Sequence, residues 1–220
     1  MNVLIACEES QTVCKAFRER GHRAFSCDLQ ECSGGHPEWH IQGDALLLIN
    51  GNCTFQTADT HTHTQSGEWD LLIAHPPCTY LSNAGACRLY PKAGQLDEAR
   101  LRKGIMAKDF FMAFWYARCD RIAIENPMPS SVFCMPPPSQ KLQPWEFGEP
   151  WTKKTYLWLK GLPPLMGTVL EYEHKPYVSS GTSANKGNKD KAGFSRAGGA
   201  SKVRSKTFQG IAKAMADQWG

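Results

Sequence analysis

The chain has 220 residues and an apolar fraction of 41%, which suits one folded domain, alone or with a small appendage. No apolar run approaches the roughly 20 residues needed to span a bilayer, and the first residues lack the basic region and cleavage site of a signal peptide. We therefore expect a cytoplasmic protein with no membrane partner. The net charge of +4 is too mild to indicate a partner, and an odd count of nine cysteines favours reduced thiols over a disulfide scaffold.

The first part of the chain predicts a strand, a helix and a second strand. Residues 3–6 form a short apolar run typical of a buried strand, and Ser10 is the predicted N-cap of a helix. Apolar residues then recur at helical spacing until Gly21, which ends the helix. Residues 23–27 predict a strand that ends on Asp28. Together these elements form a βαβ unit.

The alternation of strands and helices continues along the chain. Apolar runs predict strands over residues 69–74, 121–124 and 155–159, and a long helix over residues 96–117. Residues 50–67 are polar and rich in Thr and His, and we expect a loop there. The pattern indicates a doubly wound, mostly parallel α/β sheet, whose ligands bind at the carboxyl ends of the strands.

Two polar motifs follow strands of this predicted sheet. The first, His75-Pro76-Pro77-Cys78, places a thiol on a rigid proline turn, where a thiolate can act as a nucleophile. The second, Glu125-Asn126-Pro127, places a carboxyl at the end of a neighbouring strand, where it can act as a general acid. Taken singly, Cys78 could be a small buried apolar residue and Glu125 a surface carboxylate. Two such motifs in one small α/β domain favour a catalytic site.

The two motifs resemble those of the cytosine-C5 DNA methyltransferase family, particularly its short phage and prophage members. By the resemblance, the Cys78 thiolate adds to cytosine C6, and Glu125 supplies a proton to N3 from a carboxyl whose pKa is raised by its apolar pocket. Lys153 stands where the family carries a Gln-x-Arg-x-Arg motif, and it would hold the nucleotide flipped out of duplex DNA. The implied catalytic residues are Cys78, Glu125 and Lys153, and the implied substrate contacts include Pro77, Asn126, Pro127 and Thr155.

The resemblance also implies S-adenosylmethionine as the cofactor and methyl donor. Asp28 matches the acid that holds the cofactor ribose, and Gly43-Asp44 resembles the pair beside the adenine. Where the family has a Phe-x-Gly-x-Gly loop, this chain has Ala6-Cys7-Glu8-Glu9-Ser10 and no glycine. S-adenosylmethionine carries no phosphate, so a glycine-rich cradle is less obligatory than for dinucleotides. The implied cofactor-binding residues are Ala6, Cys7, Glu8, Ser10, Asp28, Asp44 and Pro76.

On this interpretation residues 1–160 form the catalytic domain, residues 161–206 a small basic Gly-rich segment, and residues 207–220 a C-terminal helix that packs back on the catalytic domain. The basic segment would either contact DNA or be a solvated flexible loop; its predicted DNA contacts are Lys186, Lys189, Lys191 and Arg196. Phosphate contacts position a protein without reading sequence, so we expect a short or relaxed target site. By analogy with the family, the role would be protection of a genome from restriction.

Several alternatives stay open at this point. An amino-methyltransferase would need an Asp, Asn or Ser before the prolines and an aromatic after them, which His75 and Cys78 do not supply. Ligand types suited to zinc occur at Cys27, Cys32, His36 and His40, although their spacing is not a common zinc pattern. C5 modification of cytosine in RNA or in a free nucleotide, and a catalytically silent DNA-binding homologue, are further alternatives.

Overall fold

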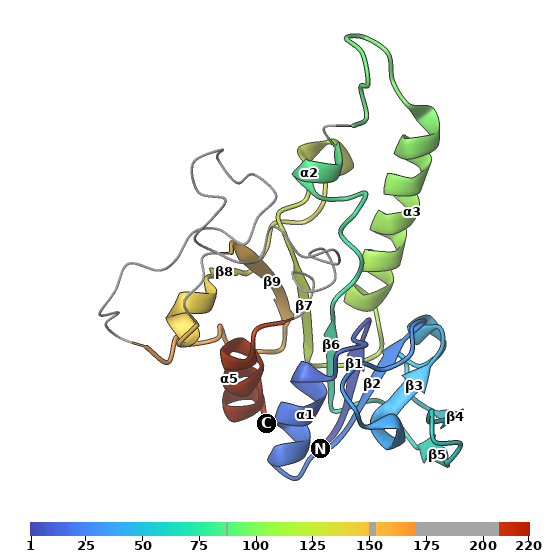
Figure 1. Ribbon diagram of the computed structural model, residues 1–220, viewed down its shortest axis with the longest axis vertical. Helices are drawn as coiled ribbons and strands as arrows, with labels where there is room; N and C mark the ends of the chain where they lie inside the picture. The colour runs from blue at the N-terminus through green and yellow to red at the C-terminus, as the bar shows by residue number, and fades with distance from the viewer. Residues whose placement is uncertain (87, 150–152, 170–206) are drawn as a thin grey trace.

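The computed structural model describes residues 1–86, 88–149, 153–169 and 207–220, and its centre is a mixed seven-stranded sheet between helices (Figure 1). The sheet order is β3-β2-β1-β6-β7-β9-β8. The fold is therefore α/β with a mostly parallel sheet, as predicted, and it is compatible with a Rossmann-like arrangement. The strands of this sheet are β1 (Asn2–Ala6), β2 (Arg23–Asp28), β3 (His40–Gln42), β6 (Leu71–Ala74), β7 (Ile122–Asn126), β8 (Gln140–Leu142) and β9 (Thr155–Lys160).

The topology places a switch point between β1 and β6. Strands β3, β2, β1, β6 and β7 are parallel, and they follow the doubly wound order in which the chain moves outward from β1 first in one direction and then in the other. β9 then runs antiparallel to β7, and β8 pairs antiparallel with β9. Ligands of such sheets bind outside the carboxyl ends of the strands at the switch point, which here means beyond Ala6 and Ala74.

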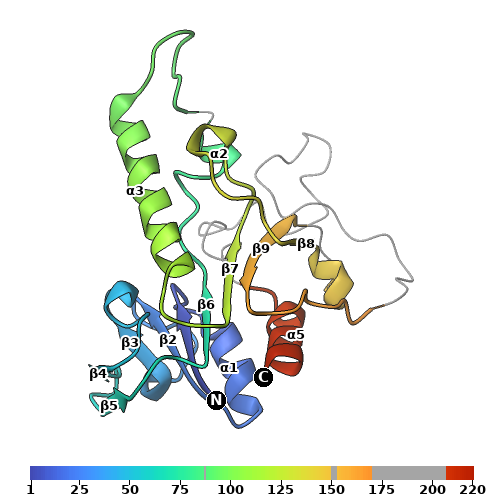
Figure 2. The ribbon, with the colours of Figure 1, turned by 180° about the vertical axis from the view of Figure 1, so that it is seen from behind.

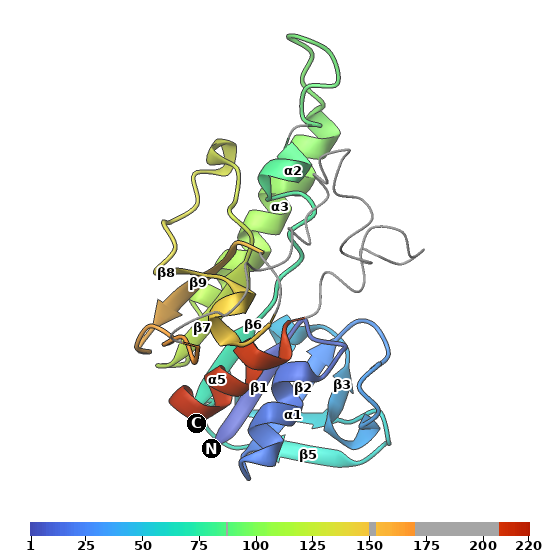
Figure 3. The same ribbon diagram turned by 60° about the vertical axis from the view of Figure 1, so that its left-hand side comes forward.

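Helices cover both faces of the sheet (Figures 1 and 3). Helices α1 (Thr12–Glu19) and α5 (Gln209–Trp219) lie on one face, and α3 (Glu98–Trp115) lies on the other. The strands supply apolar residues to both faces: Val3 and Ile5 of β1 pack on the α1 side, and Leu4 packs on the α3 side. Burial on both faces explains why the parallel strands are continuously apolar.

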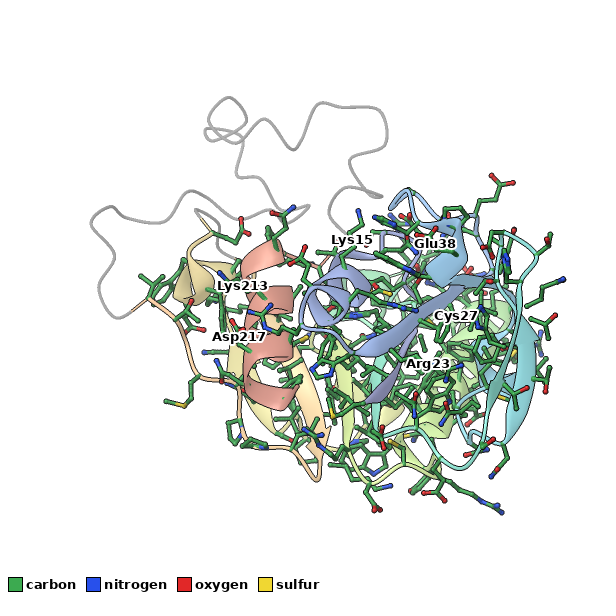
Figure 4. The ribbon with its side chains drawn as sticks, turned by 90° about the horizontal axis from the view of Figure 1, so that it is seen from below. Lys15, Arg23, Cys27, Glu38, Lys213 and Asp217 are labelled. Atoms are coloured by element: carbon green, nitrogen blue, oxygen red, sulfur yellow. The ribbon has the colours of Figure 1, made fainter. Side chains whose placement is uncertain are left out.

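The closing helix α5 is fixed to the sheet through its last turns. Trp219 is fully buried and donates from Nε1 to the carbonyl of Pro163 at 3.1 Å. Asp217 pairs with Arg20, just after α1, and the view from below shows α5 beside α1 (Figure 4). Within the described ranges, no helix combines the length and the apolar character that crossing a bilayer requires.

The prediction of a loop over residues 50–67 is wrong. This segment forms an antiparallel hairpin of β4 (Cys53–Gln56) and β5 (Thr62–Gln65), which lies beyond the β3 edge (Figure 2). Phe55 is buried and packs edge-on against Phe25, with ring centroids 5.0 Å apart. Thr suits strands because it is β-branched, but the polar composition of the segment masked its strand character.

The short helical elements are α2 (Asn83–Ala86), η1 (Pro37–Trp39), η2 (Ala45–Leu47), η3 (Ser131–Phe133) and η4 (Pro144–Phe147).

The loops that leave β6 and β7 are joined to each other and to α3. Ser82 and Pro129 form an isolated bridge, and Ser130 donates its backbone N–H to the carbonyl of Leu81 at 2.8 Å. Phe133 of η3 lies against Gly104 in the buried part of α3, where an added Cβ would come within 2.3 Å of the phenyl ring. The glycine is therefore required by the close approach of this ring.

Gly104→Ala tests that contact. At an open helical position this change stabilises by about 1 kcal/mol, but here the added methyl group overpacks the ring and we expect a loss of about 1–3 kcal/mol. Chemical denaturation of Gly104→Ala, Phe133→Ala and the double variant measures the coupling. In the Phe133→Ala background the glycine change should become neutral or stabilising; an equal loss in both backgrounds would contradict this packing.

Candidate active site at the carboxyl ends of β1, β6 and β7

The turn that carries Cys78 begins where β6 ends. His75 donates its backbone N–H to the carbonyl of Ala6 at 2.9 Å, which extends the pairing of β6 with β1 by one residue. Pro76 and Pro77 have no N–H, so the ladder stops there and the chain leaves the sheet. Asn126 Nδ2 donates to the buried carbonyl of Pro76 at 2.7 Å and joins this turn to the end of β7. Cys78 is thereby held partly exposed beyond the sheet edge.

Glu125 lies against His75 at the same edge. Its Oε2 is 3.1 Å from His75 Nδ1, and the two side chains are only 10% and 9% exposed. Because a carboxylate only accepts hydrogen bonds, Nδ1 carries the hydrogen in this contact. Thr207 Oγ1 lies 3.4 Å from the same nitrogen and brings the entry to α5 into the site. Neither the His75–Glu125 contact nor Thr207 was identified from the sequence.

Lys153 acts electrostatically on both predicted catalytic residues. Burial raises the pKa of the Cys78 thiol, and the charge of Glu125 raises it further, whereas Lys153 opposes both effects. For Glu125, burial raises the pKa, but the hydrogen bond from His75 and the charge of Lys153 outweigh it, so the net shift is downward. The expectation of a raised Glu125 pKa is therefore wrong for the protein without substrate. Its cationic neighbours, which sequence alone could not place, reverse the effect of burial.

Glu8 has a structural role that the sequence did not reveal. It is buried, and its carboxyl oxygens accept the backbone N–H groups of Val13 at 2.6 Å and Cys14 at 3.2 Å, in the first turn of α1. The prediction that Ser10 caps this helix is wrong: Gln11 occupies the N-cap position without a side-chain capping bond, and Ser10 Oγ lies 3.1 Å from Thr12 Oγ1. Glu8, for which the sequence predicts a cofactor contact, stabilises the start of α1.

The other predicted cofactor residues gather at the ends of β1, β2 and β3. Cys7 follows Ala6 with a left-handed φ of 60°, and its thiol lies close enough to Asp28 and Asp44 for both charges to raise its pKa, in addition to the larger effect of burial. A cavity of about 490 Å³ opens between η2 and the β4–β5 hairpin, with Gly43 and Asp44 in its lining. It lies at the β3 side of the sheet, and strands β2 and β1 separate β3 from β6.

The loop between β1 and α1 adopts a glycine-like backbone without glycine. Both Cys7 and Gln11 have left-handed φ values, 60° and 57°, which non-glycine residues adopt only when their surroundings impose them. Gln11 is fully buried and bonds His36 through both ends of its amide: Nε2 donates to the carbonyl at 2.8 Å, and Oε1 accepts from the N–H at 3.0 Å. Its side chain therefore holds the loop in this conformation.

The remaining predicted substrate residues are placed differently. Pro77 is exposed and Pro127 is half-buried beside the site, whereas Thr155 is 3% exposed and its hydroxyl donates to the carbonyl of Lys153 at 3.2 Å. Thr155 therefore bonds to the backbone of Lys153. The predicted contacts Lys186, Lys189, Lys191 and Arg196 lie outside the described residues.

The four side chains considered for zinc do not form a metal site. His40 is buried, with Nδ1 2.9 Å from Ser26 Oγ and Nε2 2.9 Å from the carbonyl of Gln30. The Cys27 thiol donates to the carbonyl of Gly43. In the part of the chain that the structure describes, no group of three or more His, Cys, Asp or Glu side chains could hold a metal ion.

The chain matches no protein-family model, and it has no significant match among curated proteins. Function is therefore inferred from the chemistry of the site.

Glu8 gives the site a testable pH dependence. Burial raises the pKa of its carboxyl, although His75 and the two backbone N–H groups oppose the shift. Its contribution to stability is therefore complete below the pKa of the unfolded chain and decreases as pH rises toward the folded value. The free energy of unfolding of wild type should fall relative to Glu8→Gln between about pH 4 and neutrality, because the amide cannot ionise.

Glu8→Ala provides the comparison for the helix cap. It removes both acceptors and should cost about 1 kcal/mol more than Glu8→Gln, which keeps one oxygen for Val13. Urea denaturation at a series of pH values measures both differences. A wild-type advantage that grows with pH would contradict the assigned direction of the pKa shift.

Proposed function

We propose that the chain is an S-adenosylmethionine-dependent methyltransferase that transfers a methyl group to C5 of cytosine in DNA through a covalent bond between Cys78 and C6. The observation that carries the proposal is the convergence of Cys78, Glu125 and Lys153 at one edge of the sheet, close enough that the charges of Glu125 and Lys153 both change the pKa of Cys78 and that of Lys153 lowers the pKa of Glu125. A nucleophile, a carboxyl and a cation together suit addition to an electron-poor ring.

The sheet supports the same class of enzyme. The parallel strands place the switch point between β1 and β6, next to the Cys78 turn. The reversed strand β9, inserted between β7 and β8, departs from the dinucleotide-binding order and agrees with the Rossmann-like methyltransferase fold that the motifs imply.

The chain also offers groups that fit the cofactor. Asp28 uses Oδ1 to accept the N–H of Gln30 at 2.9 Å, which leaves its second oxygen for ribose hydroxyls. Asp44 likewise uses one oxygen to cap η2 and lies in the lining of the 490 Å³ cavity, a volume within the usual range for small-molecule sites, about 300–1,000 Å³. When bound, S-adenosylmethionine supplies an electrophilic methyl group on a sulfonium; Asp28, Asp44 and the Cys7 backbone would hold it.

Each catalytic side chain then has a distinct task. Cys78 must lose its proton to attack C6, and Lys153 favours the thiolate, against the effects of burial and of Glu125. Glu125 faces the charge that develops on N3 after the attack and stabilises it as a proton donor or hydrogen-bonding partner. Asn126 keeps the Pro76 carbonyl, and with it the Cys78 turn, fixed relative to β7.

The segment after Cys78 favours a polymeric, anionic substrate over a free nucleotide. It joins α2 to α3 and extends beyond the sheet on the side of the strand carboxyl ends (Figure 2). Arg100 and Lys103 of α3 lie over the ring of Tyr80, at 5.1 and 5.7 Å from its centroid. Over residues 79–108 the acids Asp97 and Glu98 are outnumbered by basic residues, which are Arg88, Lys92, Arg100, Arg102, Lys103 and Lys108. Such a segment is suited to phosphate contacts.

Cys78→Ser should abolish methyl transfer while leaving the fold intact, because a hydroxyl is far less nucleophilic than a thiolate. Oligonucleotides with 5-fluorocytosine should trap wild type covalently, since fluorine at C5 cannot leave as a proton. Mass spectrometry of the adduct identifies the cysteine. Cys134→Ser, which changes an exposed thiol, is the matched control and should trap normally. An adduct on another cysteine, or turnover by Cys78→Ser, would refute the mechanism.

Isotopic methyl transfer to DNA, RNA and dCMP in parallel identifies the substrate class. We expect incorporation into DNA. Transfer to RNA or dCMP alone would support the proposed methyl transfer but show that the substrate is not DNA. DNA binding without transfer to any acceptor would favour a catalytically silent binding protein.

Asp28→Ala should weaken S-adenosylmethionine binding about 10- to 100-fold, because hydrogen bonds to a charged group contribute about 1.5–3 kcal/mol. DNA binding should change much less. Titration calorimetry measures the first affinity and a gel-shift assay the second. Asp109→Ala, on the exposed side of α3, is the control for loss of one carboxylate. Unchanged cofactor affinity in Asp28→Ala would show that the cofactor binds elsewhere.

A further inference from the structure

His75 contacts the carboxyl group of Glu125 and lies within electrostatic range of a second buried carboxyl group, that of Glu8. Glu125 of β7 accepts a hydrogen bond from its Nδ1 at 3.1 Å. Glu8, which follows β1, is near enough that the charge of His75 is the largest effect opposing the rise in its pKa caused by burial. The ends of β1, β6 and β7 therefore bring an acid, an imidazole and a second acid together in the interior.

The two nitrogens of the ring have different surroundings. Nδ1 carries a hydrogen, because its partner Glu125 can only accept. Nε2 is buried and has no hydrogen-bond partner among the described residues. A buried nitrogen without a partner is costly, so its presence beside a proposed catalytic carboxyl calls for a reason. The ring is oriented through one nitrogen only.

We propose that His75 is a positioning residue that also supplies the proton: it orients Glu125 through Nδ1, and the two side chains together carry the proton that cytosine N3 takes up. This inference rests on the proposed function and extends it to a residue that the two motifs did not mark as catalytic.

Addition of the Cys78 thiolate to cytosine moves one proton and three electron pairs. The reacting state holds the Cys78 thiolate, the Glu125 carboxylate and a cationic His75. The sulfur electron pair forms the S–C6 bond, the C5–C6 π pair shifts to C4–C5, and the C4–N3 π pair moves onto N3. N3 takes a proton through the Glu125 carboxyl, which is replenished from Nδ1, so His75 becomes neutral with its remaining hydrogen on Nε2, and Glu125 is again a carboxylate. The total charge is unchanged, and the proton returns along the same path when the thiolate leaves.

Other groups also face this pair. Glu8 lies beside His75, Lys153 beside Glu125, and Thr207 contributes a neutral hydroxyl 3.4 Å from Nδ1. Cys78 is coupled to Glu125 and Lys153. With so many coupled groups, the shared proton titrates as a property of the pair rather than of one residue.

His75→Asn separates orientation from proton supply. The Asn amide can place a donor near the position of Nδ1, but it cannot titrate. The pH profile of kcat/KM should show two breaks in wild type, one from Cys78 and one from the pair. In His75→Asn the second break should be that of the Glu125 carboxyl alone and should differ from the wild-type break, and kcat/KM near neutrality should fall about 10²-fold. His61→Asn is the matched control, since His61 pairs with Asp59 on the exposed hairpin at 2.7 Å. A His75→Asn variant with the wild-type rate and both breaks in place would overturn the proposal.

Nitrogen NMR of ¹⁵N-histidine-labelled protein tests the same pair without any activity. In the protein without substrate, Nδ1 of His75 should carry a hydrogen in both the cationic and the neutral ring, and the titration of the ring should change in Glu125→Gln. A neutral ring protonated only at Nε2 in that protein, or a titration that ignores Glu125→Gln, would refute the inference even if Cys78 is trapped by 5-fluorocytosine. If no cysteine is trapped but the NMR result is as expected, the proposed function fails and the proton-sharing pair stands.

Discussion

The hydrogen bond from Asn126 Nδ2 to the carbonyl of Pro76 is the contact on which the geometry of the site depends. Two consecutive prolines end the pairing of β6 and leave a buried carbonyl that needs a donor. Asn126, 50 residues later in the chain, supplies it at 2.7 Å from the last position of β7. Neighbouring parallel strands are thus locked in register at their ends. The same lock places Glu125 against His75, three residues before Cys78.

The parallel sheet is what brings the Pro76 turn and the end of β7 together. Carboxyl ends of neighbouring parallel strands meet at one edge, so residues far apart in sequence come together there without a special scaffold. The bridge between Ser82 and Pro129 continues the connection beyond the sheet, and Phe133 anchors the β7 loop on α3 at Gly104. The proposed catalytic groups therefore lie on loops that are joined to one another over several residues.

The sequence was informative where burial follows from local pattern. The apolar runs identified β1, β2, β6, β7 and β9 to within a few residues, because strands buried on both faces are continuously apolar. The hairpin in residues 50–67 and the short strands β3 and β8 were missed. The hairpin is polar and only Phe55 and Gln65 are buried among its strand residues, while three-residue strands are too short to show a period.

The candidate site was predictable to a different extent. The residue types at Cys78 and Glu125 carry a chemical signal, and the sheet brings these two strand ends together. Contacts across the fold carry no such signal. The αL backbone at Cys7 and Gln11 stands where the resembled family has a glycine loop, and Glu8 caps α1 in place of Ser10. The downward shift in the Glu125 pKa comes from His75 and Lys153, which are distant in sequence, so local reasoning from burial gave the wrong sign for Glu125.

Charge balance explains why these groups occur as a set. An ionised carboxyl in a protein interior is tolerated only when it is paired and hydrogen-bonded. Glu125 meets this condition with His75 and the charge of Lys153, whereas burial of Glu8 outweighs its two backbone N–H groups and keeps its pKa raised. A protein that needed these carboxyls only for structure could replace the pair of Glu125 and His75 by apolar residues, often without loss of stability. A titratable pair with one ring nitrogen that has no partner among the described residues, a few residues from a thiol, fits the proton transfer proposed for this site.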